Sequence, residues 1–295
     1  MKEITINTND AGQRLDKYLI KRFGMPTSLI YKYLRKKRIR LNGVRAKGAE
    51  MLQEGSVLTL YINDEFFEHK RQTVTFDGTV RIVYEDSQIA VLYKEAGLLT
   101  HASSGDSLAA RWTAHLIQTG EYDPDKEGSF VPALCHRLDR NTEGLVIAAK
   151  TAAALREMDE RIRERQVKKY YICTVVGAPK TDEGELNAWL LKDNRTNTVT
   201  VYDAPHKEAR PIRTGYRVLK RGKQSVVEVE LHTGRSHQIR AAFAHAGFPL
   251  AGDAKYGGGK GGYTLCAYKV IFDFESGLTC AGRTVETPQI LLDKI

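Results

Sequence analysis

The sequence predicts an α+β protein with a small basic domain at its N-terminus and a larger, sheet-containing domain after it. At 295 residues the chain is long enough for two domains with separate cores. Its 42% hydrophobic and 27% charged residues are typical of a globular protein. The hydrophobic pattern changes near residue 81, where short apolar runs separated by amphipathic stretches begin.

The first 63 residues combine strand and helix patterns in one short segment. Gly24 follows apolar residues at helical spacing, and Asn42-Gly43 is typical of a two-residue hairpin turn. Ser28 is expected to cap the second helix. The expected elements are a strand at 4–6, helices at 14–23 and 29–37, a hairpin at 39–44 and a strand at 57–62.

Positive charge is concentrated in this segment. Residues 1–63 contain 13 Lys and Arg against 5 Asp and Glu, whereas the other residues contain 32 against 31. Such an excess at one end is typical of a polyanion-binding protein, although a merely solvated basic surface has the same composition. The basic residues of the second helix and of the strand after it are Lys32, Arg35, Lys36, Lys37, Arg38 and Arg40.

Residues 64–80 lack a clear periodicity and are expected to form a linker. The expected elements beyond it are strands at 82–84, 89–93, 145–149, 170–176 and 225–231, and a helix at 151–165. Residues 81–295 therefore read as an α+β domain with a large mixed sheet.

Several functional classes find no support in the sequence. The four cysteines include no C-x-x-C pair, which argues against a disulfide framework and a structural zinc site and favours free, mostly buried thiols. In the Gly-rich stretch 257–262, Gly261 follows Lys260 where a phosphate-binding loop requires Ser or Thr. Neither a signal peptide nor a membrane-length apolar run is recognised, so we expect a cytoplasmic protein that does not enter a membrane.

Two charged stretches adjoin expected strands, one at residues 136–145 and one at residues 233–240. Functional side chains are commonly carried on loops that a rigid sheet holds in place. The two stretches could meet as an Arg–Asp pair in a site. An ordinary ion pair or a helix cap is the other interpretation.

Four motifs occur in order in the N-terminal segment: Arg-Leu-Asp-Lys-Tyr-Leu at 14–19, Leu-Arg-Lys-Lys-Arg-Ile at 34–39, Leu-Asn-Gly at 41–43 and Glu-Gly-Ser-Val at 54–57. Together they resemble the alpha-L RNA-binding module named for a ribosomal small-subunit protein. The resemblance implies that RNA is held by the basic second helix and the hairpin after it.

Five further motifs occur in order: Ile-Ala-Val-Leu-Tyr-Lys-Glu-Ala-Gly at 89–97, His-Arg-Leu-Asp-Arg-Asn-Thr-Glu-Gly-Leu at 136–145, Lys-Tyr-Tyr-Ile-Cys-Thr-Val-Val-Gly at 169–177, Thr-Gly-Arg-Ser-His-Gln-Ile-Arg at 233–240 and Pro-Leu-Ala-Gly-Asp-Ala-Lys-Tyr-Gly at 249–257. They resemble the pseudouridine synthase family that modifies large-subunit ribosomal RNA and some transfer RNA, over roughly residues 81–295. The resemblance implies the pseudouridine synthase fold, with a central mixed and largely antiparallel sheet, and an isomerase that converts uridine to pseudouridine in structured RNA.

The resemblance assigns roles to four residues. Asp139 matches the catalytic aspartate, and Arg240 matches the arginine that pairs with it. Tyr171 matches the tyrosine that stacks on the target uracil, and Arg137 matches the residue that helps to hold the nucleotide out of its helix. The isomerisation changes no redox state and needs no metal, so neither a cofactor nor a metal is expected.

Some positions depart from the family pattern. Glu95, Glu143, Cys173 and Cys266 stand where the motifs usually have Pro, Ser, Ala and His, and residues 273–274 are Asp-Phe in place of His-Pro. These departures leave the RNA substrate open. We expect a monomer that acts on 23S ribosomal RNA, with transfer RNA as the alternative substrate. A non-catalytic ribosome assembly factor is the alternative from another class, and an RNA-binding synthetase lacks a nucleotide-binding signature.

Overall fold

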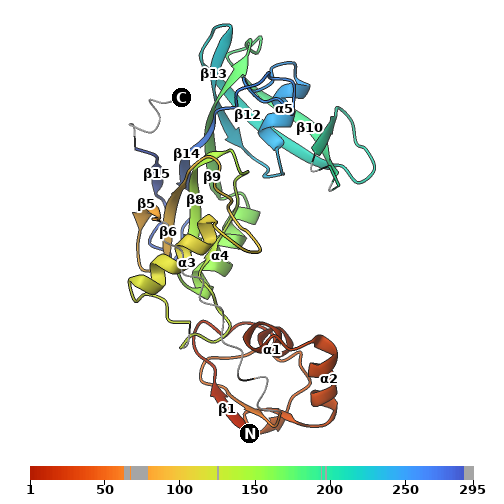
Figure 1. Ribbon diagram of the computed structural model, residues 1–295, viewed down its shortest axis with the longest axis vertical. Helices are drawn as coiled ribbons and strands as arrows, with labels where there is room; N and C mark the ends of the chain where they lie inside the picture. Colours follow the sequence, from red (N-terminus) through yellow and green to blue (C-terminus); the bar gives the residue numbers. More distant parts are fainter. Residues whose placement is uncertain (63–66, 68–78, 125, 194, 197, 289–295) are drawn as a thin grey trace. The chain divides into compact units, whose positions relative to one another are not determined.

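The computed structural model describes residues 1–62, 67, 79–124, 126–193, 195–196 and 198–288 (Figure 1). The chain divides into two compact units. The first contains residues 1–77, 111–133 and 151–153, and the second contains residues 78–110, 134–150 and 154–295. The expected linker at 64–80 falls almost entirely outside the described residues, so it stays a prediction, as does a domain boundary at residue 63.

Residues 1–62 of the first unit contain two short helices and a four-stranded sheet. The helices are α1 (Leu15–Phe23) and α2 (Thr27–Arg35), and the strand order is β1 (Lys2–Thr5), β4 (Val57–Leu60), β2 (Ile39–Leu41), β3 (Val44–Arg45). Helix α1 buries Leu15 and Leu19 on one face, and α2 buries Ile30 and Leu34. These side chains share one hydrophobic core with the strands, so the helical spacing seen in the sequence corresponds to a buried face.

Local backbone signals in this unit were mostly predicted. Gly24 ends α1 in the left-handed conformation at φ 62°, as expected. Asn42 and Gly43 both have positive φ, 51° and 78°, which matches the two-residue hairpin turn. The expected cap at Ser28 is wrong. Helix α2 begins at Thr27, preceded by Pro26 with no side-chain cap, because the ring of Pro26 already fixes a φ of −58° that suits a helix start.

Residues 1–63 also contact a later segment of the same unit. The Asp10 carboxylate accepts hydrogen bonds from the backbone N–H (2.6 Å) and hydroxyl (2.8 Å) of Ser129. Arg22 donates to the carbonyl of Gly128 at 2.6 Å. Gly128 has no room for a side chain, because a Cβ there would collide with Asp10. Removal of residues 1–63 would therefore leave buried polar groups of the remaining chain without partners.

The larger sheet has eleven strands. Its main order is β11 (Thr198–Tyr202), β10 (Glu183–Asp193), β12 (Arg210–Lys220), β13 (Gln224–Leu231), β9 (Val167–Val176), β14 (Leu265–Phe272), β8 (Glu143–Ala149), β6 (Ile89–Lys94) and β5 (Arg81–Glu85), with β15 (Thr284–Glu286) beside β14 and β7 (Ala133–Leu134) beside β8. Along this order neighbouring strands pair antiparallel, except β8 and β14, which run parallel. The expected mixed, largely antiparallel sheet is confirmed.

Helices α4 (Ala152–Arg163) and α5 (Gln238–His245) accompany this sheet, whereas most of α3 (Leu108–Gln118) belongs to the first unit. Met158 of α4 packs into a core with strands β6, β8 and β14, and α5 lies against β10, β11 and β12 (Figure 1). At Gly144 strands β8 and β14 approach so closely that a Cβ would collide with the backbone of Ala267. The loop before β8 is thereby fixed to the middle of the sheet.

Two smaller expectations concern the cysteines and membranes. All four cysteines are free thiols, and Cys173, Cys266 and Cys280 are buried, as the sequence predicted. No helix in the described part of the chain is both long and apolar enough to cross a membrane.

Candidate active site

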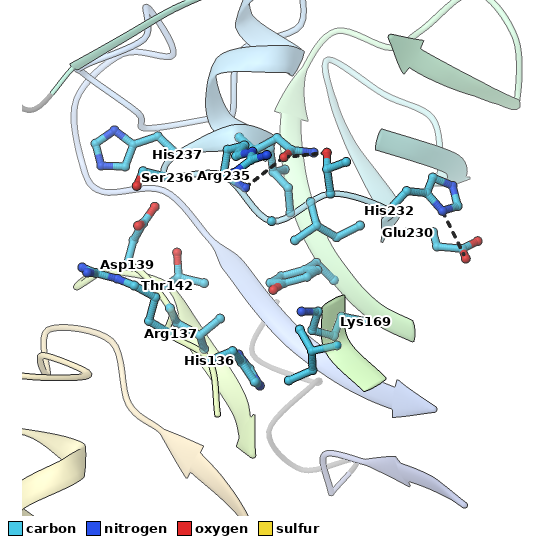
Figure 2. Close-up of a pocket in the computed structure, with 18 of the residues that line it drawn as sticks. His136, Arg137, Asp139, Thr142, Lys169, Glu230, His232, Arg235, Ser236 and His237 are labelled. Carbon is cyan, nitrogen blue, oxygen red and sulfur yellow. Dashed lines mark hydrogen bonds and ion pairs between the residues drawn. The ribbon is translucent and has the colours of Figure 1, made fainter. Parts of the chain in front are cut away.

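A cavity of about 620 Å³ lies in the second unit, where the loop before β8, strand β9 and the loop before α5 converge (Figure 2). Asp139, Arg137, Tyr171 and Arg240 all line it. The four residues to which the sequence assigned site roles are therefore brought together. Figure 2 shows the Asp139 carboxylate pointing toward Ser236 on the opposite loop.

Buried hydrogen bonds hold the loop that carries Asp139. The backbone N–H of Leu138 donates to the hydroxyl of Thr100 at 3.1 Å, and that hydroxyl donates to the Leu138 carbonyl at 2.7 Å. The fully buried ammonium of Lys94 donates to the carbonyl of Arg140 at 3.0 Å. Burial lowers the pKa of Lys94 to about 8, although the charge of Asp139 opposes this shift. These hydrogen bonds fix the residues immediately before and after Asp139, Leu138 and Arg140.

His136 connects the same loop to strand β8 by a hydrogen bond. Its Nε2 accepts a hydrogen bond from the backbone N–H of Ile147 in β8, at 3.2 Å. Burial lowers the pKa of His136 to about 3, and the positive charge of Lys169 acts in the same direction. The imidazole is therefore neutral near pH 7, with the proton on Nδ1, and acts as a structural acceptor.

Tyr171 lies on β9 with only 4% of its surface exposed. Burial raises the pKa of its hydroxyl, and the negative charge of Asp139 raises it further. The hydroxyl consequently keeps its proton at neutral pH and is available as a hydrogen-bond donor.

Arg240 does not form the expected ion pair with Asp139. Its Nε and Nη2 instead donate to the two carboxylate oxygens of Asp253, at 2.7 and 2.8 Å. Asp253 is almost completely buried, at 1% exposure, and satisfies this guanidinium better than a half-buried loop residue would. Burial lowers the pKa of Arg240, but the Asp253 hydrogen bonds and attraction to Asp139 outweigh it and raise the pKa overall. The rings of Tyr256 and Tyr263 lie 5.0 and 4.3 Å from the guanidinium carbon.

Three residues near this pair received no role from the sequence. Asp253 and Tyr256 belong to the last of the five motifs, and His237 belongs to the arginine motif. His237 has a left-handed backbone at φ 55°, lines the cavity and places Nδ1 2.7 Å from the hydroxyl of Tyr256. Their positions within the motifs indicated that they lie near the site. Which side chains contact each other could not be predicted, because it depends on loop geometry that residue spacing does not encode.

Glu143 follows Asp139 closely in the chain but does not line the cavity. Its carboxylate accepts a hydrogen bond from the hydroxyl of Tyr93 at 3.0 Å, in a region shared with Cys266. Two of the departures from the family pattern, Glu143 and Cys266, therefore adjoin each other at the β8–β14 pair and outside the cavity lining.

The cavity carries a strong excess of positive charge. Its lining includes seven basic residues and only two acidic ones, Asp139 and Glu230. The basic residues are Arg137, Arg163, Arg165, Lys168, Lys169, Arg235 and Arg240. A concave, cationic surface of this kind concentrates anionic ligands such as a nucleic-acid backbone.

The basic residues proposed for the N-terminal domain lie in the first unit and take no part in this cavity. All six are exposed, on α2 or on the residues that follow it: Lys32, Arg35, Lys36, Lys37, Arg38 and Arg40. No carboxylate among the described residues lies within ion-pairing distance of any of them. They form a cationic surface, which we call the α2 surface.

Comparisons with known proteins agree with this geometry. Residues 88–245 match the family model described as RNA pseudouridylate synthase. A protein of Vibrio vulnificus named ribosomal large subunit pseudouridine synthase C is 32% identical over 86% of this chain and 79% of its own length. The Escherichia coli protein of the same name is 32% identical over 87% and 80%. The solved human RNA pseudouridylate synthase domain containing 4 shares the fold, with a TM-score of 0.58 over 72% of this chain and 90% of its own, at 20% identity. The chain belongs to the RNA pseudouridylate synthase family.

Proposed function

We propose that this enzyme converts specific uridines to pseudouridine in large-subunit ribosomal RNA and that Asp139 is its catalytic group. The observation that carries the proposal is the single cationic cavity in which Asp139, Tyr171 and Arg240 meet. The names of the 30–32% identical relatives support ribosomal RNA as the substrate. Transfer RNA is the alternative. We expect the protein to act as a monomer in the cytoplasm.

The reaction breaks the bond between the ribose and N1 of uracil, turns the base and joins the ribose to C5. C5 then loses its proton and N1 gains one, so the product is an isomer of uridine. The base must first leave the RNA stack, which costs a few kcal/mol. The buried ring of Tyr171 offers a stacking face worth roughly 1–3 kcal/mol, and its protonated hydroxyl can donate to the detached base. Arg137, exposed at the cavity rim, is suited to fill the space that the base leaves in the RNA.

Asp139 must be ionised to attack the nucleotide or to remove a proton from it. The guanidinium of Arg240 favours the ionised form by its charge. Because Asp253 occupies Nε and Nη2 of Arg240, the guanidinium is held in one orientation, and Nη1 makes no hydrogen bond to a described residue. Asp253 thus orients Arg240, whose charge favours the ionised form of Asp139.

The α2 surface supplies affinity in this proposal. Six exposed cations that pair with no described carboxylate can neutralise phosphates at little structural cost, and each contact releases counterions. The module holds the RNA while the chemistry proceeds in the second unit.

The test compares Asp139→Asn with Glu143→Gln. Both variants neutralise one carboxylate of the same motif, but only Asp139 lines the cavity. Tritium release from C5 of labelled uracil is measured on ribosomal and on transfer RNA from cells that lack the enzyme, with RNA binding in parallel. We expect release from ribosomal RNA by the parent and by Glu143→Gln, and RNA binding without release by Asp139→Asn.

Each other result contradicts a defined part of the proposal. Continued release by a folded Asp139→Asn variant would mean that another group is catalytic. Release by the parent from transfer RNA alone would mean that transfer RNA, and not ribosomal RNA, is the substrate. A parent that binds both RNAs and releases tritium from neither would favour the non-catalytic assembly factor.

A further inference from the structure

Lys169 is a cation in the cavity that the proposed chemistry does not use. It lies on β9 two residues before Tyr171, on the same face of the strand, and lines the cavity. Figure 2 shows Lys169 and His136 away from Ser236 and His237, toward the other end of the cavity. No described carboxylate lies within ion-pairing distance of its ammonium group, and burial lowers the pKa of Lys169. A desolvated cation without a counterion costs free energy, which a bound anion would offset.

The neighbouring charges are already engaged. Lys168, which also lines the cavity, pairs with Asp273 at 2.6 Å. Arg163 lies 3.6 Å from Glu160. The cavity's second carboxylate, Glu230, lies 3.6 Å from Nδ1 of His232. None of these groups neutralises Lys169, and the neutral imidazole of His136 does not do so either.

Arg165 is another cation of the cavity lining without a carboxylate partner among the described residues. It is exposed, lines the cavity and forms the turn between α4 and β9 in a left-handed conformation at φ 63°. Among the described residues no acidic group pairs with its guanidinium. Lys169 and Arg165 are therefore two cations of the same cavity lining that have no carboxylate partner among the described residues.

We propose that Lys169, assisted by Arg165, binds an RNA backbone phosphate next to the target uridine. The inference rests on the proposed function, because it assumes that the uracil lies against Tyr171. Two residues along a strand span about 6.6 Å, so Lys169 lies about one nucleotide's reach from the ring of Tyr171. At this distance from its base, a nucleotide in RNA carries a backbone phosphodiester, which is an anion. A lysine ammonium, with three donors and a compact charge, is suited to bind it.

The first test measures binding of a short synthetic RNA, containing a uridine that the parent modifies, over a series of salt concentrations. Lys169→Gln should bind more weakly, and its slope of log affinity against log salt should be shallower by about 0.7, the value for one single-strand phosphate contact. Lys223→Gln is the matched control: the same residue type, exposed and outside the cavity lining. It should keep the parental slope. An unchanged slope in Lys169→Gln would overturn the proposal.

The second test identifies the phosphate. Phosphates around the uridine are replaced one at a time by uncharged methylphosphonates. One replacement should weaken binding to the parent about tenfold or more, the value of a charge-assisted hydrogen bond, and should have no effect on Lys169→Met. Lys169→Met should melt no lower than the parent, because it removes a desolvated charge. If every methylphosphonate weakens the parent and Lys169→Met equally, or if Lys169→Met melts lower than the parent, the lysine is structural and the proposal fails.

Tritium release by the parent on the same RNA separates the two proposals. Normal release without dependence of binding on Lys169 overturns only the phosphate site. A Lys169-dependent methylphosphonate effect on an RNA from which the parent releases no tritium overturns the proposed reaction and leaves the anion site standing.

Discussion

The α2 surface and the cavity are both strongly basic, yet their cations are held in different ways. On the α2 surface six side chains are exposed and unpaired with any described carboxylate. In the cavity, Arg240 is bound to the buried Asp253 and Lys168 to Asp273, and only some of the lining cations, such as Lys169 and Arg165, have no described carboxylate partner. Exposed cations on long side chains bind phosphates without fixing them in place, whereas paired and buried cations have fixed positions.

This difference suggests a division of labour. Loosely held charges can supply affinity and its salt dependence on a large polyanion. Fixed charges can supply the geometry that a reaction requires, because a preorganised group needs no rearrangement when charge develops. The predictions below change one region at a time.

The largest effect is expected from the α2 surface. Replacing Lys32, Lys36 and Lys37 together by Gln should reduce the salt slope by about 2 to 3 and RNA affinity by about a hundredfold at moderate salt. Replacing Lys180, Lys207 and Lys223, which are also exposed, is the matched control for charge and number. Equal losses in both variants would mean that net charge, and not the α2 surface, drives binding. Substitutions are preferable to deletion of residues 1–63, which would also remove the partner of Ser129.

Tyr171→Phe should have an effect of similar size, but on the reaction rate and not on RNA affinity. The ring remains, so affinity should stay within a few-fold of the parent. The rate under single-turnover conditions should fall about a hundredfold if the protonated hydroxyl donates during rejoining. A Phe variant as fast as the parent would limit the role of Tyr171 to stacking.

The smallest effect is expected from His136 and appears only in acid. Its pKa of about 3 in the fold lies below the ordinary value near 6.5, so the unfolded chain takes up a proton first as the pH falls. Stability from this group is therefore complete above pH 6.5 and is lost as the pH falls toward 3, by up to about 2 kcal/mol at pH 5. In His136→Gln the side-chain oxygen can still accept a hydrogen bond from Ile147, but the group no longer titrates. Between pH 8 and pH 5 this variant should therefore lose about 2 kcal/mol less unfolding free energy than the parent. The exposed His206, changed to Gln, should leave the loss unchanged.

Sequence patterns predicted the parts of this structure that local periodicity encodes. The buried face of α1, the turn at Asn42 and the strand that follows the Asp139 loop agree with spacing and turn chemistry. The family motifs then brought Asp139, Tyr171 and Arg240 to one site. The partner of Arg240 was not predicted correctly, because Asp253 lies on a separate loop that only the folded sheet brings to α5. The lack of a carboxylate partner for Lys169 was missed for the same reason. Whether a lysine is unpaired depends on the positions of all nearby carboxylates in the folded chain.

The division of labour is tested most directly by the single-turnover rate at saturating RNA in the Lys32/Lys36/Lys37→Gln variant. If the α2 surface supplies only affinity, raising the RNA concentration should restore the parental rate, while Asp139→Asn should stay inactive at every concentration. A triple variant whose rate remains low when all of it is bound to RNA would contradict the account, because the α2 surface would then take part in forming the reactive complex.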